Sequence, residues 1–145
     1  MRSYLTLNIV LYNDDIEPMK VALEAAKRAG ITAVIASDMA AISYARSIGL
    51  EVHISTQLNV SNYEALKFYA QFADVVVLAR ELNMEQVAAI HKIILDENIC
   101  GPKGELIRIE MFCHGALCMA ISGKCYLSLH QLGRSANRGE CMQVC

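Results

Sequence analysis

Hydrophobic and polar residues follow two periods along the chain, because short apolar runs are separated by longer amphipathic stretches. The apolar runs are typical of β-strands; they span 4–12, 31–37, 50–56, 74–80 and 106–112. The amphipathic stretches carry apolar residues on one face at helical spacing; they span 17–30, 39–49, 62–73 and 84–98. We therefore predict five strands that alternate with four helices.

Residues that begin and end helices support these boundaries. Asp38 and Asn83 precede two predicted helices, and both residue types cap helix N-termini. The helix over 62–73 is expected to open at Asn59 or Ser61. Glycines close the first two predicted helices, as is common at helix C-termini.

Alternation of this kind predicts an α/β fold with parallel strands, either a doubly wound sheet or an arc of a (β/α)8 TIM barrel. No glycine-rich phosphate loop follows the first strand, whereas polar residues stand near the carboxyl end of every strand. In a barrel these ends share one mouth, where active sites lie. We therefore favour a partial, TIM-barrel-like arc of five parallel strands.

The chain is too short to close such a barrel, which needs about 200 residues or more. We expect a partial barrel domain over 1–112 and a Cys-rich segment of the same domain over 113–145. Unpaired strand edges tend to pair with another chain, so the fragment is expected to form a homo-oligomer.

Charge and hydropathy exclude some partners. Lys and Arg number 13 against 15 Asp and Glu, a net charge of -2, so no global basic field indicates nucleic acid. No apolar run approaches the ~18 residues of a membrane span. The N-terminal apolar run is interrupted by Asn8 and lacks a cleavage site. We therefore expect a cytoplasmic protein with no membrane partner.

Four of the six cysteines fall near the C-terminus, namely Cys118, Cys125, Cys141 and Cys145. Four thiolates can hold a zinc ion or an iron–sulfur cluster. Zinc ribbons favour short Cys-x-x-Cys pairs, which are missing here, so the spacing leans towards a cluster. The alternative is a set of buried thiols without a ligand. Cys100 and Cys113 lie outside the group and are interpreted as structural.

The stretch EMFCHGALCMAISGKCYLS, residues 110–128, closely resembles the motif of the collagenase-like peptidases of unassigned catalytic type, peptidase family U32. The matching positions are Glu110, Phe112, Gly115, Ala116, Leu117, Cys118, Gly123, Cys125, Leu127 and Ser128. The stretch RSANRGECMQVC resembles the next block of the family. Further likeness in YLTLN, HISTQLNVSN and VVLAREL extends the resemblance over essentially the whole chain.

The resemblance implies a larger barrel-like protein, of which this chain holds the middle strands and the cysteine block. It implies that the four C-terminal cysteines bind a 4Fe–4S cluster in the full-length protein. We expect the isolated fragment to be inactive and to lack the cluster, because Cys145 is its final residue and a ligand on a fraying terminus opens readily. Family members act in RNA-base hydroxylation or ubiquinone synthesis, and others are named peptidases. The stretches ARSIG, HISTQ and IEMFCHGALC most resemble the sequences of the branch that hydroxylates a cytidine in ribosomal RNA.

Two other functions stay open. A cysteine peptidase needs a thiolate beside a histidine base, but Cys113 and His114 are neighbours and would point to opposite faces if the strand continued through them. A helical zinc peptidase needs two histidines around a glutamate, and the corresponding helix offers only His91. The third possibility is a non-catalytic, metal-stabilised binding module.

Other polar residues complete the candidate site. Glu110, His114 and His53 stand near strand ends, where acid–base groups of barrel enzymes are found, although such residues are often caps or satisfied core groups. Basic residues near the cysteines can bind the phosphates of ribosomal RNA or a small acidic co-substrate, or they belong to a solvated loop. These residues are Lys124, Arg134 and Arg138.

Overall fold

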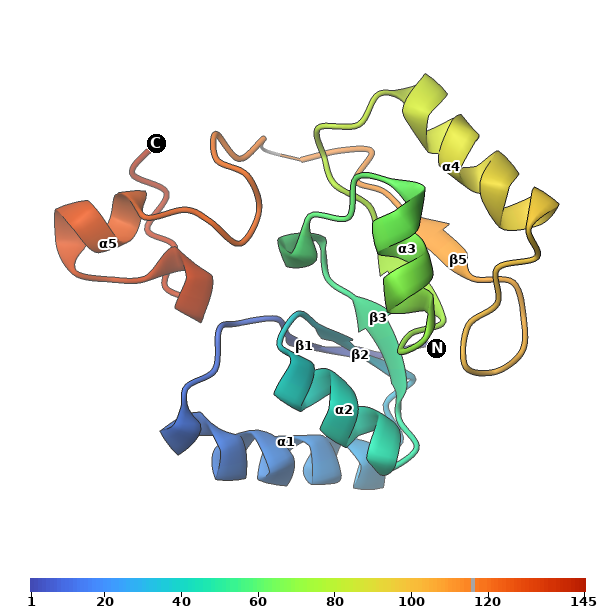
Figure 1. Ribbon diagram of the computed structural model, residues 1–145. Coiled ribbons are helices and arrows are strands. Elements are labelled where there is room, and N and C mark those ends of the chain that lie inside the picture. Colours follow the sequence, from blue (N-terminus) through green and yellow to red (C-terminus); the bar gives the residue numbers. More distant parts are fainter. Residues whose placement is uncertain (116) are drawn as a thin grey trace.

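The computed structural model describes residues 1–115 and 117–145, and Figure 1 follows the chain from its N-terminus to its C-terminus. The strands are β1 (Tyr4–Leu7), β2 (Ala33–Ala36), β3 (Glu51–Ile54), β4 (Val75–Val77) and β5 (Arg108–Glu110). The helices are α1 (Ile16–Arg28), α2 (Met39–Ser47), α3 (Tyr63–Ala70), α4 (Met84–Asp96) and α5 (Leu127–Leu132). Three single 3-10 turns span Asn13–Asp15, Thr56–Leu58 and Ala136–Arg138.

The five strands form one parallel sheet in the order β1-β2-β3-β4-β5. The strand order follows the chain order, so each of the first four helices connects two neighbouring strands. A doubly wound sheet instead reverses its strand order at one point. The predicted alternation of five parallel strands with helices is confirmed.

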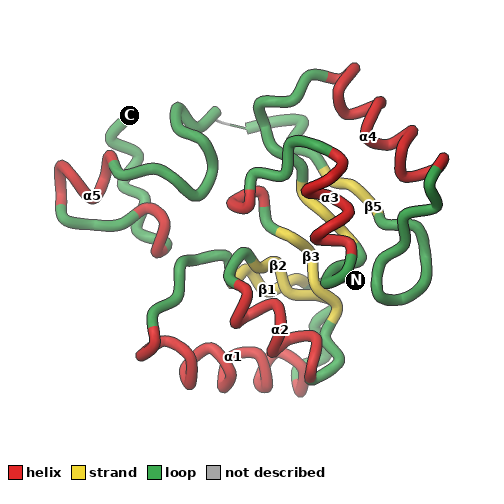
Figure 2. Tube along the Cα trace, in the orientation of Figure 1, coloured by secondary structure: helices red, strands yellow, loops and turns green. Residues whose placement is uncertain are grey.

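One face of the sheet is apolar and packs against helices. Because side chains alternate along a strand, residues two apart share a face, and this face carries Leu5, Leu7, Val34, Ala36, Val52, Ile54, Val76 and Ile109. The same core cluster includes apolar residues from each of α1, α2, α3 and α4. All four helices therefore cover one face, and Figure 2 shows them along that side of the strands.

The opposite face of the sheet carries a mixture of polar and apolar side chains. Thr6, Ile35, His53 and Val77 lie on it, as do charged residues of β3 and β5. This face, and the carboxyl ends of its strands, provide the surfaces on which the candidate site is built.

Helix starts agree with the predicted caps at two of three positions. The Asp38 side chain accepts a hydrogen bond from the Ala40 N–H at 2.9 Å, and Asn83 forms a capping box with Gln86. The prediction that α3 opens at Asn59 or Ser61 is wrong, because Asn62 caps it. A 3-10 turn over Thr56–Leu58 occupies the preceding residues and displaces the helix start.

The C-terminal segment contains α5 and a 3-10 turn, which the sequence pattern did not predict. In Figure 1 this segment lies to one side of the sheet, away from α1 to α4. Among the described residues, no helix combines the length and apolar character needed to cross a membrane.

Candidate functional site

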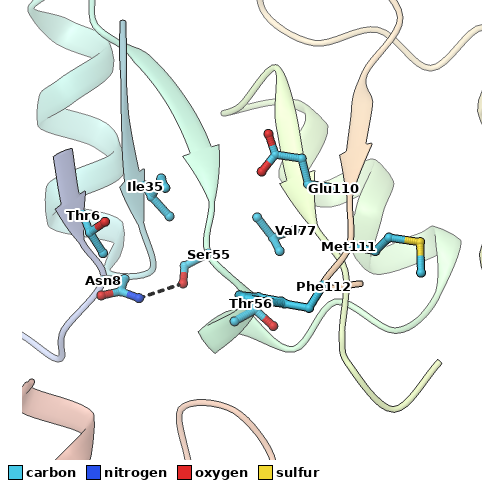
Figure 3. Close-up of a pocket in the computed structure, with 9 residues that line it drawn as sticks. All are labelled: Thr6, Asn8, Ile35, Ser55, Thr56, Val77, Glu110, Met111 and Phe112. Atoms are coloured by element: carbon cyan, nitrogen blue, oxygen red, sulfur yellow. Dashed lines mark hydrogen bonds between the residues drawn. The ribbon is translucent and has the colours of Figure 1, made fainter. Parts of the chain in front are cut away.

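A pocket of about 280 Å³ opens where the strands end, and we call it the strand-end pocket. Figure 3 shows its lining residues, which come from β1 to β5 and the residues that follow them. They are Thr6, Asn8, Ile35, Ser55, Thr56, Val77, Glu110, Met111 and Phe112. Parallel strands place their carboxyl ends at one edge, so residues from distant parts of the sequence meet there.

Hydrogen bonds fix one wall of the strand-end pocket. The Asn8 Nδ2 group donates to Ser55 Oγ at 3.2 Å, and Ser37 Oγ donates to the Asn8 carbonyl oxygen at 2.9 Å. Ile35 and Val77 supply apolar surface, whereas the Phe112 ring is 59% exposed. The pocket thus combines an amide, hydroxyl groups and a carboxylate with an aromatic ring.

A second pocket of about 360 Å³ adjoins the first, and we call it the cysteine pocket. All four predicted ligand cysteines line it, namely Cys118, Cys125, Cys141 and Cys145. Asn8 and Thr56 line both pockets, so the thiols lie next to the strand ends. The structure therefore brings together the four cysteines that the sequence grouped.

The four thiols are free and surround the cavity without forming a compact ligand group. Cys125 is half-buried, and the other three are exposed. Within residues 1–115 and 117–145, no three His, Cys, Asp or Glu side chains approach closely enough to hold a metal ion in the present arrangement. Cys100 and Cys113 are not among the residues that line this cavity.

Close backbone contact holds residues 117–145, which we call the cysteine segment, against the strand ends. Gly123 has a φ of +76°, and a Cβ atom at this position would collide with the carbonyl oxygen of Gln57. Glycine avoids both the collision and the strain of a left-handed backbone. Arg80, which follows β4, donates a hydrogen bond to the buried Ser122 hydroxyl. The segment is therefore fitted to the residues that follow β3 and β4, and a larger residue at 123 would break the contact with Gln57.

Arg138 ties the same segment to the residues that follow β1. Its guanidinium forms an ion pair with Asp15 at 2.7 Å and lies 4.2 Å from the centre of the Tyr12 ring. It also donates to the Val10 carbonyl oxygen at 3.0 Å. The hydrogen bond from Arg138 lowers the pKa of Asp15. The guanidinium that was a candidate for substrate binding is thus engaged within the chain.

The other residues that the sequence suggested for the site, Lys124, Arg134 and His114, do not take part in these contacts. Lys124 and Arg134 are exposed on the cysteine segment. His114 is exposed and lines a neighbouring pocket with Arg80, Phe112 and Cys113. β5 ends at Glu110, so Cys113 and His114 are not part of a strand, and the expectation that a strand would separate them does not apply.

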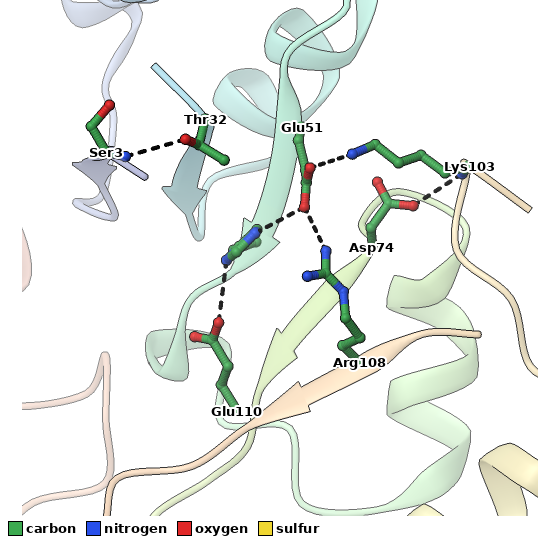
Figure 4. A network of polar contacts seen from close by, with 8 residues as sticks. Ser3, Thr32, Glu51, Asp74, Lys103, Arg108 and Glu110 are labelled. Carbon is green, nitrogen blue, oxygen red and sulfur yellow. Dashed lines mark hydrogen bonds and ion pairs between the residues drawn. The ribbon is translucent and has the colours of Figure 1, made fainter. Parts of the chain in front are cut away.

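A charged network lies on the polar face of the sheet, as Figure 4 shows. His53 is only 3% exposed; its Nε2 lies 3.1 Å from Glu51 Oε1, and its Nδ1 lies 3.6 Å from Glu110 Oε1. Glu51 also pairs with Lys103 and with Arg108, whose Nη2 is 2.7 Å from Oε1. The structure thus brings His53 and Glu110 together and leaves His114 elsewhere.

The charge state of Glu51 is set by its partners. Burial raises the pKa of this carboxyl, but hydrogen bonds from Lys103, His53 and Arg108 outweigh burial and lower the pKa to about 2. Three donors to one carboxylate favour its ionised form. Glu51 is therefore a fixed negative charge beside the buried histidine at neutral pH.

Sequence reasoning missed several residues of the site. Glu51 and His53 are two apart in a strand, which places them on one face and gives a signal for their pairing. Lys103 and Arg108 lie 52 and 57 positions from Glu51, and no local pattern links them to it. Phe112 was recognised only as a motif position, although it supplies the exposed ring of the strand-end pocket.

Comparison with known proteins gave matches over the whole chain. The model of peptidase family U32 matches residues 1–145. A protein named collagenase from Porphyromonas gingivalis is 65% identical over 145 residues, which are 100% of this chain and 35% of that protein. No solved structure gave a significant match.

Two further relatives carry names from RNA modification. A 23S rRNA 5-hydroxycytidine synthase of Escherichia coli is 39% identical over 143 residues, which cover 98% of this chain and 20% of that protein. The tRNA hydroxylation protein P1 of Bacillus subtilis is 35% identical over 145 residues, covering 98% of this chain and 32% of that protein. The chain thus spans about a third or less of the length of these relatives.

Proposed function

The chain belongs to peptidase family U32, and on that premise we propose that it is part of an iron–sulfur-dependent hydroxylase of RNA bases, with cytidine in ribosomal RNA as its target. The observation that carries the proposal is the cysteine pocket, in which four thiols adjoin the strand-end pocket through Asn8 and Thr56. Relatives named for hydroxylation of ribosomal and transfer RNA support the same activity.

The donor set in the cysteine pocket fits a 4Fe–4S cluster. Four thiolates are the usual ligands of such a cluster, and here they are Cys118, Cys125, Cys141 and Cys145. The absence of short Cys-x-x-Cys pairs in the sequence favours a cluster over zinc. When bound, the cluster would supply one-electron transfer beside the strand-end pocket.

The strand-end pocket offers the groups that recognise an unstacked base. Proteins bind such bases by stacking on aromatic rings and by hydrogen bonds to the base edge. The exposed Phe112 ring is available for stacking, and the Asn8 amide and the Glu110 carboxylate are available for the edge. We place the reacting base in this pocket, with Glu110 as the acid–base group that touches it.

Basic residues on the cysteine segment are the proposed contacts to RNA phosphates or to a small acidic co-substrate. Lys124 and Arg134 are exposed and suit this role. Arg138 already pairs with Asp15, so its contribution is to hold the segment in place. A cluster bound by exposed thiolates also favours a reducing compartment, and we therefore place the protein in the cytoplasm.

We further propose that the sheet is an arc of a larger (β/α)8 barrel. Sequential parallel strands with helices on one face are the arrangement of a barrel wall. The polar face would then line the barrel interior, and the pockets would lie at its mouth. Light scattering of the isolated chain tests this arc, because exposed strand edges favour association and a clean monomer would speak against it.

A collagenase-like peptidase is the second candidate, favoured by the name of the relative that is 65% identical. The described residues give this chemistry little support. Cys113 and His114 share a pocket, but the structure records no contact between the Cys113 thiol and the His114 ring.

Nucleoside mass spectrometry separates the two functions. RNA from cells that lack the gene should lose a hydroxylated pyrimidine, and the complete protein should restore it. A Cys141→Ser variant should fail to restore it, whereas Cys100→Ser should succeed. Unchanged RNA together with cleavage of collagen by both variants would replace the hydroxylase with a peptidase.

A further inference from the structure

Glu110 is the carboxylate of the strand-end pocket, and the ring of a buried histidine lies beside it. Its side chain is 50% exposed at the pocket, while His53 behind it is almost fully buried. The two approach each other at 3.6 Å between Glu110 Oε1 and His53 Nδ1. The pocket wall thus has a carboxylate in front and an imidazole directly behind it.

The other side of the imidazole is fixed as well. His53 Nε2 lies 3.1 Å from Glu51 Oε1, and the Tyr4 ring packs on the imidazole with 5.2 Å between ring centres. Glu51 is in turn held by Lys103 and Arg108. A side chain constrained at one nitrogen and along its ring has little freedom to move the other nitrogen.

The row formed by Glu51, His53 and Glu110 could either transfer protons or hold the Glu110 carboxylate in a fixed orientation. The charge of Glu51 decides between these two roles. A proton path through Glu51 requires that this carboxyl take up a proton during turnover. Its pKa is lowered to about 2, so the protonated form is rare at neutral pH. The network therefore favours fixed geometry and a fixed charge over proton transport.

Resting on the proposed function, we propose that His53 is a positioning residue: its ring is anchored at Nε2 by the Glu51 carboxylate, and it limits the orientations open to the Glu110 carboxylate, whose Oε1 lies 3.6 Å from Nδ1 at the wall of the strand-end pocket. The Glu110 carboxylate then meets the base in one orientation. Because His53 is buried, water is kept away from the side of the carboxylate that faces the imidazole. Misplacement of a reacting group by about 1 Å can lower a rate ~100-fold. The contact at 3.6 Å therefore has a measurable role in turnover.

Two substitutions separate positioning from stability. The amide nitrogen of asparagine stands near the place of histidine Nδ1, and that of glutamine near the place of Nε2. His53→Asn keeps a donor towards Glu110 and loses the contact with Glu51. His53→Gln keeps a donor towards Glu51 and loses the contact with Glu110. Both variants remove the same ring, so both lose similar packing.

In the complete protein, kcat for hydroxylation should fall about 10- to 100-fold in His53→Gln with little change in KM. His53→Asn loses the Glu51 anchor but keeps a polar atom beside Glu110, so its kcat should fall less than that of His53→Gln, and thermal unfolding should give similar stabilities for the two variants. Equal activities, or a more active His53→Gln, would overturn the proposal, because activity would then follow the Glu51 contact or stability alone.

A measurement that needs no turnover keeps this inference separate from the proposed function. In 15N-labelled protein, Glu110→Gln should shift the His53 Nδ1 resonance, and Glu51→Gln should shift the Nε2 resonance. An unchanged Nδ1 resonance in Glu110→Gln would overturn the positioning contact whatever the activity. A wild type that shows the contact but hydroxylates no RNA would instead remove the proposed function and retain the pairing of His53 with Glu110.

Discussion

Arg138 and Asp15 form an ion pair with 2.7 Å between Nη1 and Oδ2, although 123 positions separate them in the sequence. The pair joins the cysteine segment to the residues just before α1. A backbone hydrogen bond from the Val10 N–H to the Asn137 carbonyl oxygen, 2.9 Å long, lies beside it. The segment that carries the thiols is therefore held by polar contacts against the loop and the 3-10 turn that follow β1.

Arg138→Ala should weaken this docking and lower the retention of iron. Arg134→Ala is the matched control, because Arg134 is exposed and makes no ion pair within the described parts of the chain. The control should keep its iron but lose about one unit of salt dependence in RNA binding for each lost phosphate contact. Iron analysis and binding titrations over a range of salt concentrations measure both effects. If Arg138→Ala kept its iron and lost the same salt dependence, Arg138 would be an RNA ligand.

Gly123→Ala should weaken the contact between the cysteine segment and the turn after β3, whereas Gly133→Ala should leave this contact intact. Both glycines have a positive φ, +76° and +67°, so each substitution incurs ~1 kcal/mol of backbone strain. Only Gly123 adds a collision with the Gln57 backbone, since nothing lies within 4 Å of a Cβ at Gly133. We expect faster proteolysis of the segment in Gly123→Ala alone. Equal proteolysis of the two variants would mean that the Gln57 contact does not hold the segment.

The order of elements could be predicted from the sequence because periodicity reports the buried face of each element. Runs such as 31–37 indicated buried strands, and Asp38 marked the start of α2. Strand ends were predicted too long, since the apolar run over 4–12 continues after β1 as a loop. The start of α3 was missed because Asn59 caps a 3-10 turn and not the helix.

The candidate site was predictable where a motif concentrates its residues. The four cysteines lie within one short stretch and line one pocket. The partner of Arg138 and the cations around Glu51 come from remote parts of the chain, and pairing across such separations depends on the folded sheet. His53 could be placed near a strand end, but its neighbours on both sides follow only from the register of β3 with β4 and of β4 with β5.

Glu51→Gln should reduce stability at neutral pH and should make stability less sensitive to acid. The folded state lowers the pKa of Glu51 from its usual value near 4.5 to about 2. The carboxylate therefore stabilises the fold at pH values above about 4.5, by about 3 kcal/mol, and this contribution is lost as the pH falls towards 2. Glu105→Gln is the control, because Glu105 is an exposed carboxylate that lines a surface pocket together with Glu51, Lys103 and Arg108. Urea unfolding between pH 2 and 7 measures the difference. Two variants with the same pH profile would show that the network around Glu51 adds no stability.

Iron and acid-labile sulfide analysis of anaerobically purified complete protein tests the central claim most directly. The wild type and Cys100→Ser should each contain about four irons and four sulfides per chain, as a 4Fe–4S cluster requires. Serine at Cys118, Cys125, Cys141 or Cys145 should remove most of the iron, because these four thiols line the cysteine pocket. Metal-free wild-type protein, or the same iron content in all five variants, would contradict the assignment of this pocket to a cluster.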